Sequence, residues 1–298
     1  MRNKALPGSV SEMGLKFDGL DADKHVLDTL QFSTALEGNA RLYRLVAHYC
    51  FHGEVLRPRS HSDLRCFAMP AERGSHESLL VILTGAVHQI PAFADVYKTA
   101  MDWLVAKVMG FIKDKLSGQG NVNELAEIIK LQAEQDAELK AVLANGLIKA
   151  NDQLSSLQEK LIDTLPLLVE AAQPNLRKAL RPVGFSCSKM TQFPEQDEPV
   201  VVTEAEALAI RSDEDLVVGK PDDFMVTRLH SLSLDTGACR LEVEGLEGLV
   251  NGKVDDITLK QPGNAYTRAL DAHGSLRVRA RPVYRKDELH KLFITEAD

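Results

Sequence analysis

Residues 92–116 read AFADVYKTAMDWLVAKVMGFIKDKL, and this stretch decides how the rest of the 298-residue chain is interpreted. Its apolar residues recur at steps of three and four, the spacing that places side chains on one face of an α-helix. The apolar positions are Met101, Leu104, Val105, Val108, Ile112 and Leu116. Gly118 and Gly120 end the pattern. The stretch therefore predicts an amphipathic helix. The parts of the chain that precede and follow this helix have different sequence patterns.

C-terminal to this helix, a second long helical region is predicted from Val122 to Leu165. Asn145-Gly146 is a candidate break within it, and Pro166 would kink or end it because proline lacks the N–H that a helix needs. Its leucines would either pack inside the chain's own core or form the seam of an oligomerising coiled coil. These residues are Leu139, Leu143, Leu147, Leu154, Leu157 and Leu161. The second alternative predicts a homo-oligomer.

N-terminal to the helix, residues 14–91 predict a small α/β sheet domain after a flexible start at 1–13. The expected order is strand, helix, strand, strand, and then the helix of residues 92–116. The expected strands are 15–17, 64–69 and 79–83, with a turn at 70–75. A helix is expected over about 34–51, where Gly53 would cap its end.

The C-terminal third has a β pattern. Residues 182–200 contain four Pro and Gly positions and predict a linker, and Thr203-Glu204-Ala205-Glu206 predicts the start of a short helix. Strands are then expected at 224–233, 240–243, 248–254, 276–283 and 289–295, with hairpin turns at 235–237 and 261–264. The sequence thus predicts an α+β protein with an N-terminal α/β domain, central long helices over 92–181 and a small β-barrel or sandwich over 201–298.

Composition limits the function classes. The net charge of −8 favours solubility and gives no general attraction to nucleic acid or anionic lipid, although it allows a local basic patch. The four cysteines form no CxxC pair and are expected to be reduced thiols. The longest uncharged stretch, 79–94, is too short to span a bilayer. We therefore expect a cytoplasmic protein without an integral membrane segment.

The most pointed candidate site is the alternating stretch Arg277-Val278-Arg279-Ala280-Arg281. On a strand the three arginines would point to one face, where guanidinium groups could bind phosphates. The alternative is a solvated strand face whose arginines pair with acidic neighbours such as Glu242 and Glu244.

Two clusters have residue types that bind metals. Asp18, Asp21 and Asp23 could hold a hard cation, but the remaining EF-hand ligands are missing, and a solvated turn is the favoured interpretation. His48 and His52 are four residues apart on a predicted helix, but the glutamate of the HExxH motif is absent and no third ligand is indicated.

The sequence contains no catalytic or cofactor signature. There is no GxSxG elbow, no GxxxxGK[ST] loop and no GxGxxG loop. No cofactor is therefore expected.

Two groups of segments resemble a family of uncharacterised bacterial proteins with paired domains of unknown function. The first group is GLKFDG at 14–19 with ALEG at 35–38. The second is GKV at 252–254, QPGNAYTRAL at 261–270 and LHKLFI at 289–294. The resemblance brings no known active site, and by association it implies a role in phage defence or on mobile elements.

Three hypotheses follow. The leading one is a non-enzymatic, self-associating binding protein that engages a protein partner or other ligand through the arginine face, as a component of bacterial anti-phage defence. The second is a nucleic-acid or nucleotide-phosphate sensor that uses Arg277, Arg279 and Arg281. The third is a metal-dependent hydrolase that uses the Asp18 cluster.

Overall fold

The computed structural model describes residues 9–56, 62–69, 77–84, 91–147 and 155–298. The chain divides into two compact units, each with its own hydrophobic core. Unit 1 comprises Met1–Leu116 and Gly120–Ile210, and unit 2 comprises Ser117–Gln119 and Arg211–Asp298. The α+β class predicted from the sequence is confirmed.

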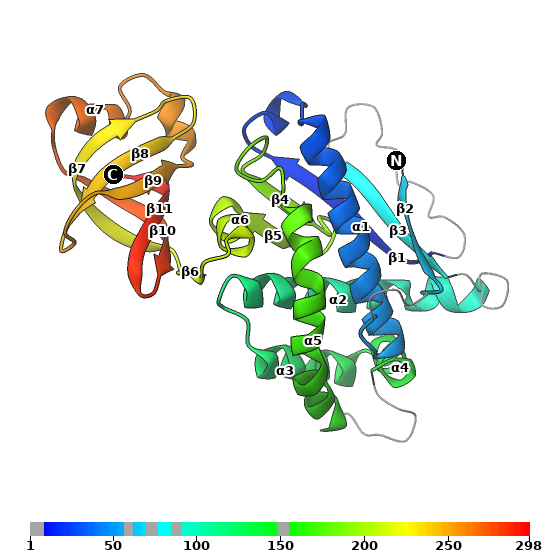
Figure 1. Ribbon diagram of the computed structural model, residues 1–298. Coiled ribbons are helices and arrows are strands. Elements are labelled where there is room, and N and C mark those ends of the chain that lie inside the picture. The colour runs from blue at the N-terminus through cyan, green and yellow to red at the C-terminus, as the bar shows by residue number, and fades with distance from the viewer. Residues whose placement is uncertain (1–8, 57–61, 70–76, 85–90, 148–154) are drawn as a thin grey trace. The chain divides into compact units, whose positions relative to one another are not determined.

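Unit 1 is built on a five-stranded sheet in the order β2-β3-β1-β4-β5, in which all neighbours are antiparallel (Figure 1). The strands are β1 (Ser9–Asp18), β2 (Leu64–Met69), β3 (Glu77–Thr84), β4 (Lys189–Gln192) and β5 (Val200–Thr203). Alternate residues of β1 are buried, and they include Met13, Leu15 and Phe17. This period of two is expected for a strand with one face on the core.

Six α-helices complete unit 1 among the described residues: α1 (Thr29–His52), α2 (Pro91–Leu116), α3 (Val122–Gln135), α4 (Ala137–Asn145), α5 (Ser155–Ala179) and α6 (Glu204–Arg211). A 3-10 turn, η1 (Ala22–Lys24), follows β1. Helix α1 begins where the Asp28 carboxylate accepts the N–H of Gln31, and ends at Gly53 with φ 67°. The Thr203 hydroxyl and N–H both donate to Glu206, which confirms the predicted start of α6.

The central helices differ from the prediction in two places. Helix α4 does end at Asn145-Gly146, but a further break occurs at Asp136, whose carboxylate caps α4 by accepting from the N–H of Glu138 and Leu139. Helix α5 continues past Pro166 and Pro174. Burial of Leu165 and other apolar residues of α5 stabilises by about 1.5–3 kcal/mol per side chain, which offsets the roughly 3 kcal/mol that an internal proline costs.

The expected linker at 182–200 is corrected by the structure. Strand β4 lies in this segment and pairs with β1, while Val183, Cys187 and Met190 are buried in the core of unit 1. Strand β4 has only four residues, and three consecutive ones are buried, so the sequence shows no alternation that would indicate a strand between the surrounding prolines. Part of the expected flexible start is corrected too, because Ser9–Met13 belongs to β1.

The leucine stripe is internal to unit 1. Leu139, Leu143, Leu147, Leu157 and Leu161 are at most 1% exposed and belong to one core cluster, while Leu154 lies outside the described residues. These five side chains therefore supply no accessible coiled-coil seam. They pack inside the core of unit 1, as the first of the two alternatives predicted.

Helices α1 and α5 lie side by side and contact each other closely (Figure 1). The two helices approach closely at Gly38, where an added Cβ would lie 2.3 Å from the backbone nitrogen of Ala179 and 2.7 Å from the carbonyl oxygen of Asn175. Both contacts are to backbone, which cannot swing aside. Glycine is therefore required for α5 to pack on α1.

Unit 2 is a closed five-stranded barrel with one extra strand. Its strands are β6 (Leu216–Val218), β7 (Asp222–Leu232), β8 (Ala238–Val243), β9 (Val250–Val254), β10 (Leu276–Arg285) and β11 (Glu288–Ala297). Strand β10 pairs with both β7 and β11, which closes the barrel, and β11 runs parallel to β9. Strand β6 adds to β10. The sequence prediction of a barrel or sandwich is thereby resolved to a barrel.

A 3-10 helix, η2 (Ile257–Lys260), and helix α7 (Ala265–Ala272) lie between β9 and β10. The predicted hairpin turn at 261–264 instead joins these two helices, and the Asn264 side chain caps α7 by accepting the N–H of Thr267. Tyr266 of α7 is buried in the barrel core. The strand order, the parallel β9–β11 pair and the helix before β10 are those of the OB fold, a Greek-key barrel.

Truncating a leucine of the stripe tests its internal position. Leu143→Ala should lower the free energy of unfolding by about 2–5 kcal/mol, because it opens a cavity in the core. Leu131→Ala is the matched control, since Leu131 is 51% exposed on α3 and its loss should change stability by about 0.5 kcal/mol or less. Urea unfolding and light scattering measure both quantities. A change in assembly mass without loss of stability in Leu143→Ala would contradict internal packing.

A polar network is enclosed between β1, α1 and α2. The Tyr43 hydroxyl donates to Ser11 Oγ at 2.5 Å, and the Ser11 hydroxyl donates to Asp102 Oδ1 at 2.5 Å. The Glu12 N–H also donates to Asp102 Oδ1, at 2.8 Å. Burial raises the pKa of Asp102 from 3.8 to about 7, although these hydrogen bonds and Lys98 act in the opposite direction.

The raised pKa of Asp102 makes stability depend on pH. The protonated form of Asp102 adds to the free energy of unfolding. This contribution is fully present below pH 3.8 and is lost as pH rises through about 7. Asp102→Asn keeps an oxygen acceptor and cannot ionise, so its stability relative to the wild type should rise by up to a few kcal/mol between pH 4 and pH 8. Urea unfolding at the two pH values measures this difference. The same pH dependence in both proteins would contradict the assignment.

Candidate ligand-binding face and side-chain clusters

The arginine row lies on β10 as its alternation predicted. Arg277, Arg279 and Arg281 point outward, while Val278 and Ala280 are buried in the barrel core. The row is not uniform, however.

The first two arginines of the row pair with an acidic side chain. Arg277 Nη2 lies 2.8 Å from Asp223 Oδ2, and Arg279 Nη1 lies 3.9 Å from Asp223 Oδ1. The acidic partner of these two is therefore Asp223 on the neighbouring strand β7. Glu242, which the sequence suggested, instead accepts a hydrogen bond from His230 Nε2 at 2.8 Å. Much of the positive charge at this end of the row is locally balanced.

Arg281 lies in a different surrounding. It is opposite Phe293 of β11, and Phe293 is in turn opposite Lys253 of β9. Residues that are directly opposite in a sheet share a face, so these three side chains form one row across three strands.

A second row runs beside it. Arg240 of β8 is opposite Asn251 of β9, which is opposite Lys291 of β11. Lys291 Nζ lies 4.8 Å from the ring centroid of Phe293, which joins the two rows. We call the two rows together the β9 face. It consists of Arg240, Asn251, Lys253, Lys291, Phe293 and Arg281.

Four of the six side chains of the β9 face are cationic. Arg240 and Asn251 are exposed, and Lys253, Lys291 and Arg281 are half-buried. Phe293 is only 7% exposed. The face thus presents positive charge to solvent rather than an open aromatic surface, although residues 211–298 hold more acidic than basic side chains.

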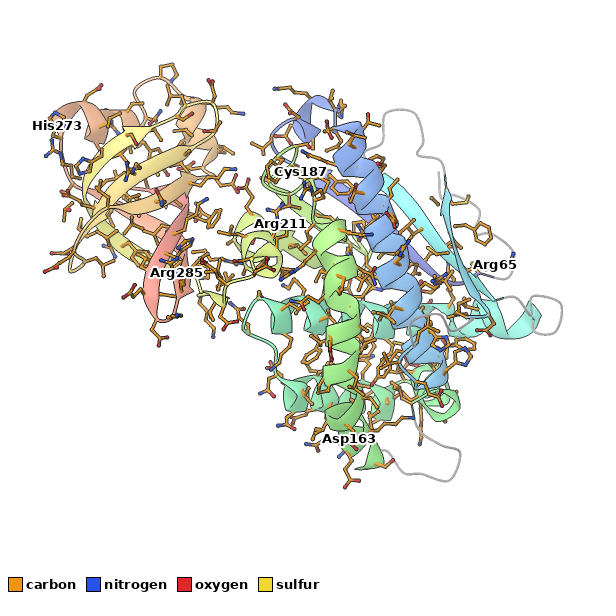
Figure 2. All side chains as sticks on the ribbon, viewed as in Figure 1. Arg65, Asp163, Cys187, Arg211, His273 and Arg285 are labelled. Carbon is orange, nitrogen blue, oxygen red and sulfur yellow. The ribbon has the colours of Figure 1, made fainter. Side chains whose placement is uncertain are left out.

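Two tight turns flank the barrel strands. Asp235-Thr236-Gly237 turns β7 into β8, as predicted, and the Thr236 side chain is hydrogen-bonded to Ser233. Lys286 and Asp287 turn β10 into β11 with φ values of 50° and 65°. Arg285 lies at this end of β10 (Figure 2) and approaches Glu214 at 3.4 Å. These turns fix the register on which the rows depend.

The acidic cluster Asp18, Asp21 and Asp23 does not converge. Asp18 pairs with Lys16 at 3.1 Å, Asp21 with Lys24 at 3.2 Å, and Asp23 accepts the N–H of Gly19 at 2.7 Å. Each carboxylate is thus directed to a different partner around the turn. The structure supports the solvated turn, and the hydrolase hypothesis loses its proposed ligands.

His48 and His52 do converge, and a third group joins them. Their ring centroids are 4.4 Å apart near the end of α1. Asp63, just before β2, places Oδ1 3.2 Å from His52 Nε2. Burial, and then the nearby His52, lower the pKa of His48. Asp63 could not be predicted from the sequence, because no known motif spacing links it to His48 and His52.

The cysteines are free thiols with little nucleophilic character. Burial raises the pKa of Cys50 well above its usual value, that of Cys66 to about 12 and that of Cys239 to about 11. A thiol needs a lowered pKa to act as a nucleophile at neutral pH. These three residues are therefore packing groups.

Comparison with known proteins places the chain in a family. The model of a domain of unknown function, DUF7946, matches residues 13–211, and that of a family of unknown function, DUF7947, matches residues 225–298. The chain belongs to the DUF7946 family. The DUF7946 match ends next to Ile210, where unit 1 ends, and the DUF7947 match covers most of the barrel. The paired domains of unknown function implied by the resemblance are confirmed.

Neither the curated proteins nor the solved structures gave a significant match. Within the described part of this DUF7946 protein, no helix is both long enough and apolar enough to cross a membrane. The function must therefore be argued from the site.

Proposed function

We propose that this DUF7946 protein is a non-enzymatic binding protein whose barrel binds single-stranded nucleic acid on the β9 face. The proposal rests on four cations that lie side by side on strands β8, β9, β11 and β10 of an OB barrel. In that fold the second and third strands, here β8 and β9, form the surface that holds extended polymeric ligands.

The charge distribution supports a phosphate-rich ligand. Arg240 and Lys253 lie on neighbouring strands and follow the barrel surface with Lys291 and Arg281. A row of cations can track a phosphate backbone and release its counterions, which favours binding. Arg277 and Arg279, two of the three arginines chosen from the sequence, lie opposite β7 and outside the surface formed by β8 and β9, so they are expected to contribute less.

The near-complete burial of Phe293 shapes the expected specificity. Base stacking needs an open aromatic face, and Phe293 is covered in part by Lys291. Recognition then rests on phosphates rather than bases. The ligand should bind with little sequence preference and strong salt dependence.

A matched pair of double variants tests the face. Arg240→Ala/Lys253→Ala should weaken binding of a fluorescent oligothymidylate by about tenfold or more, because it removes two phosphate contacts. Arg277→Ala/Arg279→Ala removes the same charge from the part of β10 that lies outside the β9 face, and it should change affinity by less than about threefold. Fluorescence anisotropy with the full chain measures both. A larger loss of affinity in the second variant would show that the ligand binds at the arginine row of β10 instead. No binding by the wild type would refute the proposed function.

Salt dependence provides an independent readout. The logarithm of the wild-type association constant should fall with the logarithm of salt concentration, with a slope of about −2 to −3 for up to four contacts. Arg240→Ala/Lys253→Ala should reduce the size of that slope by about 1 to 1.5. A slope that is unchanged in the variant would show that these side chains do not contact phosphates.

The cellular setting is a separate part of the proposal. We propose that the protein acts in a reducing cytoplasm, which its free thiols are consistent with, and that it takes part in phage–host conflict, which the family resemblance supports by association alone. Challenge of cells that express the wild-type or the Arg240→Ala/Lys253→Ala chain with phage tests this link. Equal plaque counts with and without the protein would count against it.

A further inference from the structure

The end of α1 and the start of β2 bring together three side chains of metal-binding type. The nitrogen of His48, the nitrogen of His52 and the carboxylate oxygen of Asp63 that form the group all lie within 4.8 Å of one another. It is the only such group of three found in the part of the chain that the structure describes. The proposed nucleic-acid face uses none of these residues.

We propose that His48, His52 and Asp63 bind a divalent transition-metal ion of the zinc class. Two imidazoles and one carboxylate are a ligand set that such ions prefer, and hard ions such as Mg²⁺ favour all-oxygen sites.

The helix supplies the first two ligands. His48 and His52 are four residues apart on α1, so both rings project from one face of the helix. His52 is the last residue of α1 and Gly53 turns the chain away, which leaves the His52 ring 35% exposed. An ion can therefore reach the pair from solvent.

The spacing of the third ligand fits a metal. Ligand atoms about 2.0–2.1 Å from a tetrahedral ion are roughly 3.3 Å apart. Asp63 Oδ1 is already 3.2 Å from His52 Nε2. The ion would replace the hydrogen bond between them. The three ligand atoms lie within 4.8 Å of one another, so the His48 ring would have to move closer to the other two to bind the same ion.

A neighbouring hydroxyl orients the His48 ring. Ser62 Oγ lies 3.3 Å from His48 Nδ1 and also accepts the N–H of Leu64 at 3.2 Å. Leu64 is 1% exposed at the start of β2, so the hydroxyl is held by the sheet. Metal-bound histidines commonly have such an outer partner on the other ring nitrogen. Ser62 thereby directs His48 Nε2 toward the ion and acts as a positioning residue.

Three protein ligands leave a fourth position of a tetrahedral ion for water. The site would thus be an open one, unlike the closed four-ligand sites that stabilise small domains. Metal loading should therefore be reversible without unfolding of unit 1.

Titration of the full chain with Zn²⁺ in competition with a chromophoric chelator tests the site. The wild type should bind one ion through this group, and His48→Ala/His52→Ala should lose at least about 100-fold in affinity. Asp63→Ala should lose about 10- to 100-fold, and Ser62→Ala about tenfold.

His230→Ala is the matched control, because His230 pairs with the single carboxylate Glu242 and has the same residue types without a third ligand. Its affinity should equal that of the wild type. Circular dichroism confirms that each variant folds, which is expected because His52 and Asp63 are exposed. Wild-type affinity in His48→Ala/His52→Ala, or no Zn²⁺ binding by the wild type, would overturn the proposal. Neither result bears on the β9 face.

Discussion

The contact between α1 and α5 at Gly38 is the constraint on which unit 1 depends. A side chain larger than hydrogen at this position would collide with the backbone of α5 near Asn175 and Ala179. Because the helices approach so closely, α5 leads the chain back to the sheet, where β4 can pair with β1. The same packing buries Leu161 and Leu165, which offsets the two prolines inside α5. The close packing at this one glycine thus helps to bring β4 beside β1, although the two strands are about 170 residues apart in the sequence.

Most elements could be predicted from periodicity, but their partners could not. Strand Leu64–Met69 and the barrel strands have clear patterns, and Gly53 marks the end of α1. The four residues of β4 are too few to show a pattern, so a buried strand resembled a linker. The leucine stripe had the correct period, but periodicity alone cannot tell a helix buried in its own chain from one at an oligomer seam. Asp136 shows how a single capping side chain can divide a continuous apolar pattern.

The candidate sites show the same limit. Sequence alternation put three arginines on the outside of β10, which is confirmed, but it did not show that Asp223 faces two of them. Arg240, Lys253 and Lys291 were missed because they are distant in sequence and become neighbours only through strand register. Asp63 was missed for a similar reason. Local spacing identifies residues on one element, whereas a site usually combines several elements.

We propose that the β9 face of the barrel binds an extended anionic strand. Hydrogen–deuterium exchange on the full chain, with and without a saturating oligothymidylate, maps the contact without any substitution. We expect slower exchange upon binding in peptides that cover β8, β9 and β11, residues 238–254 and 288–297, and unchanged exchange in the first half of β7, residues 222–227. Protection confined to β7 and the Arg277–Arg279 part of β10, or to unit 1, would contradict the account.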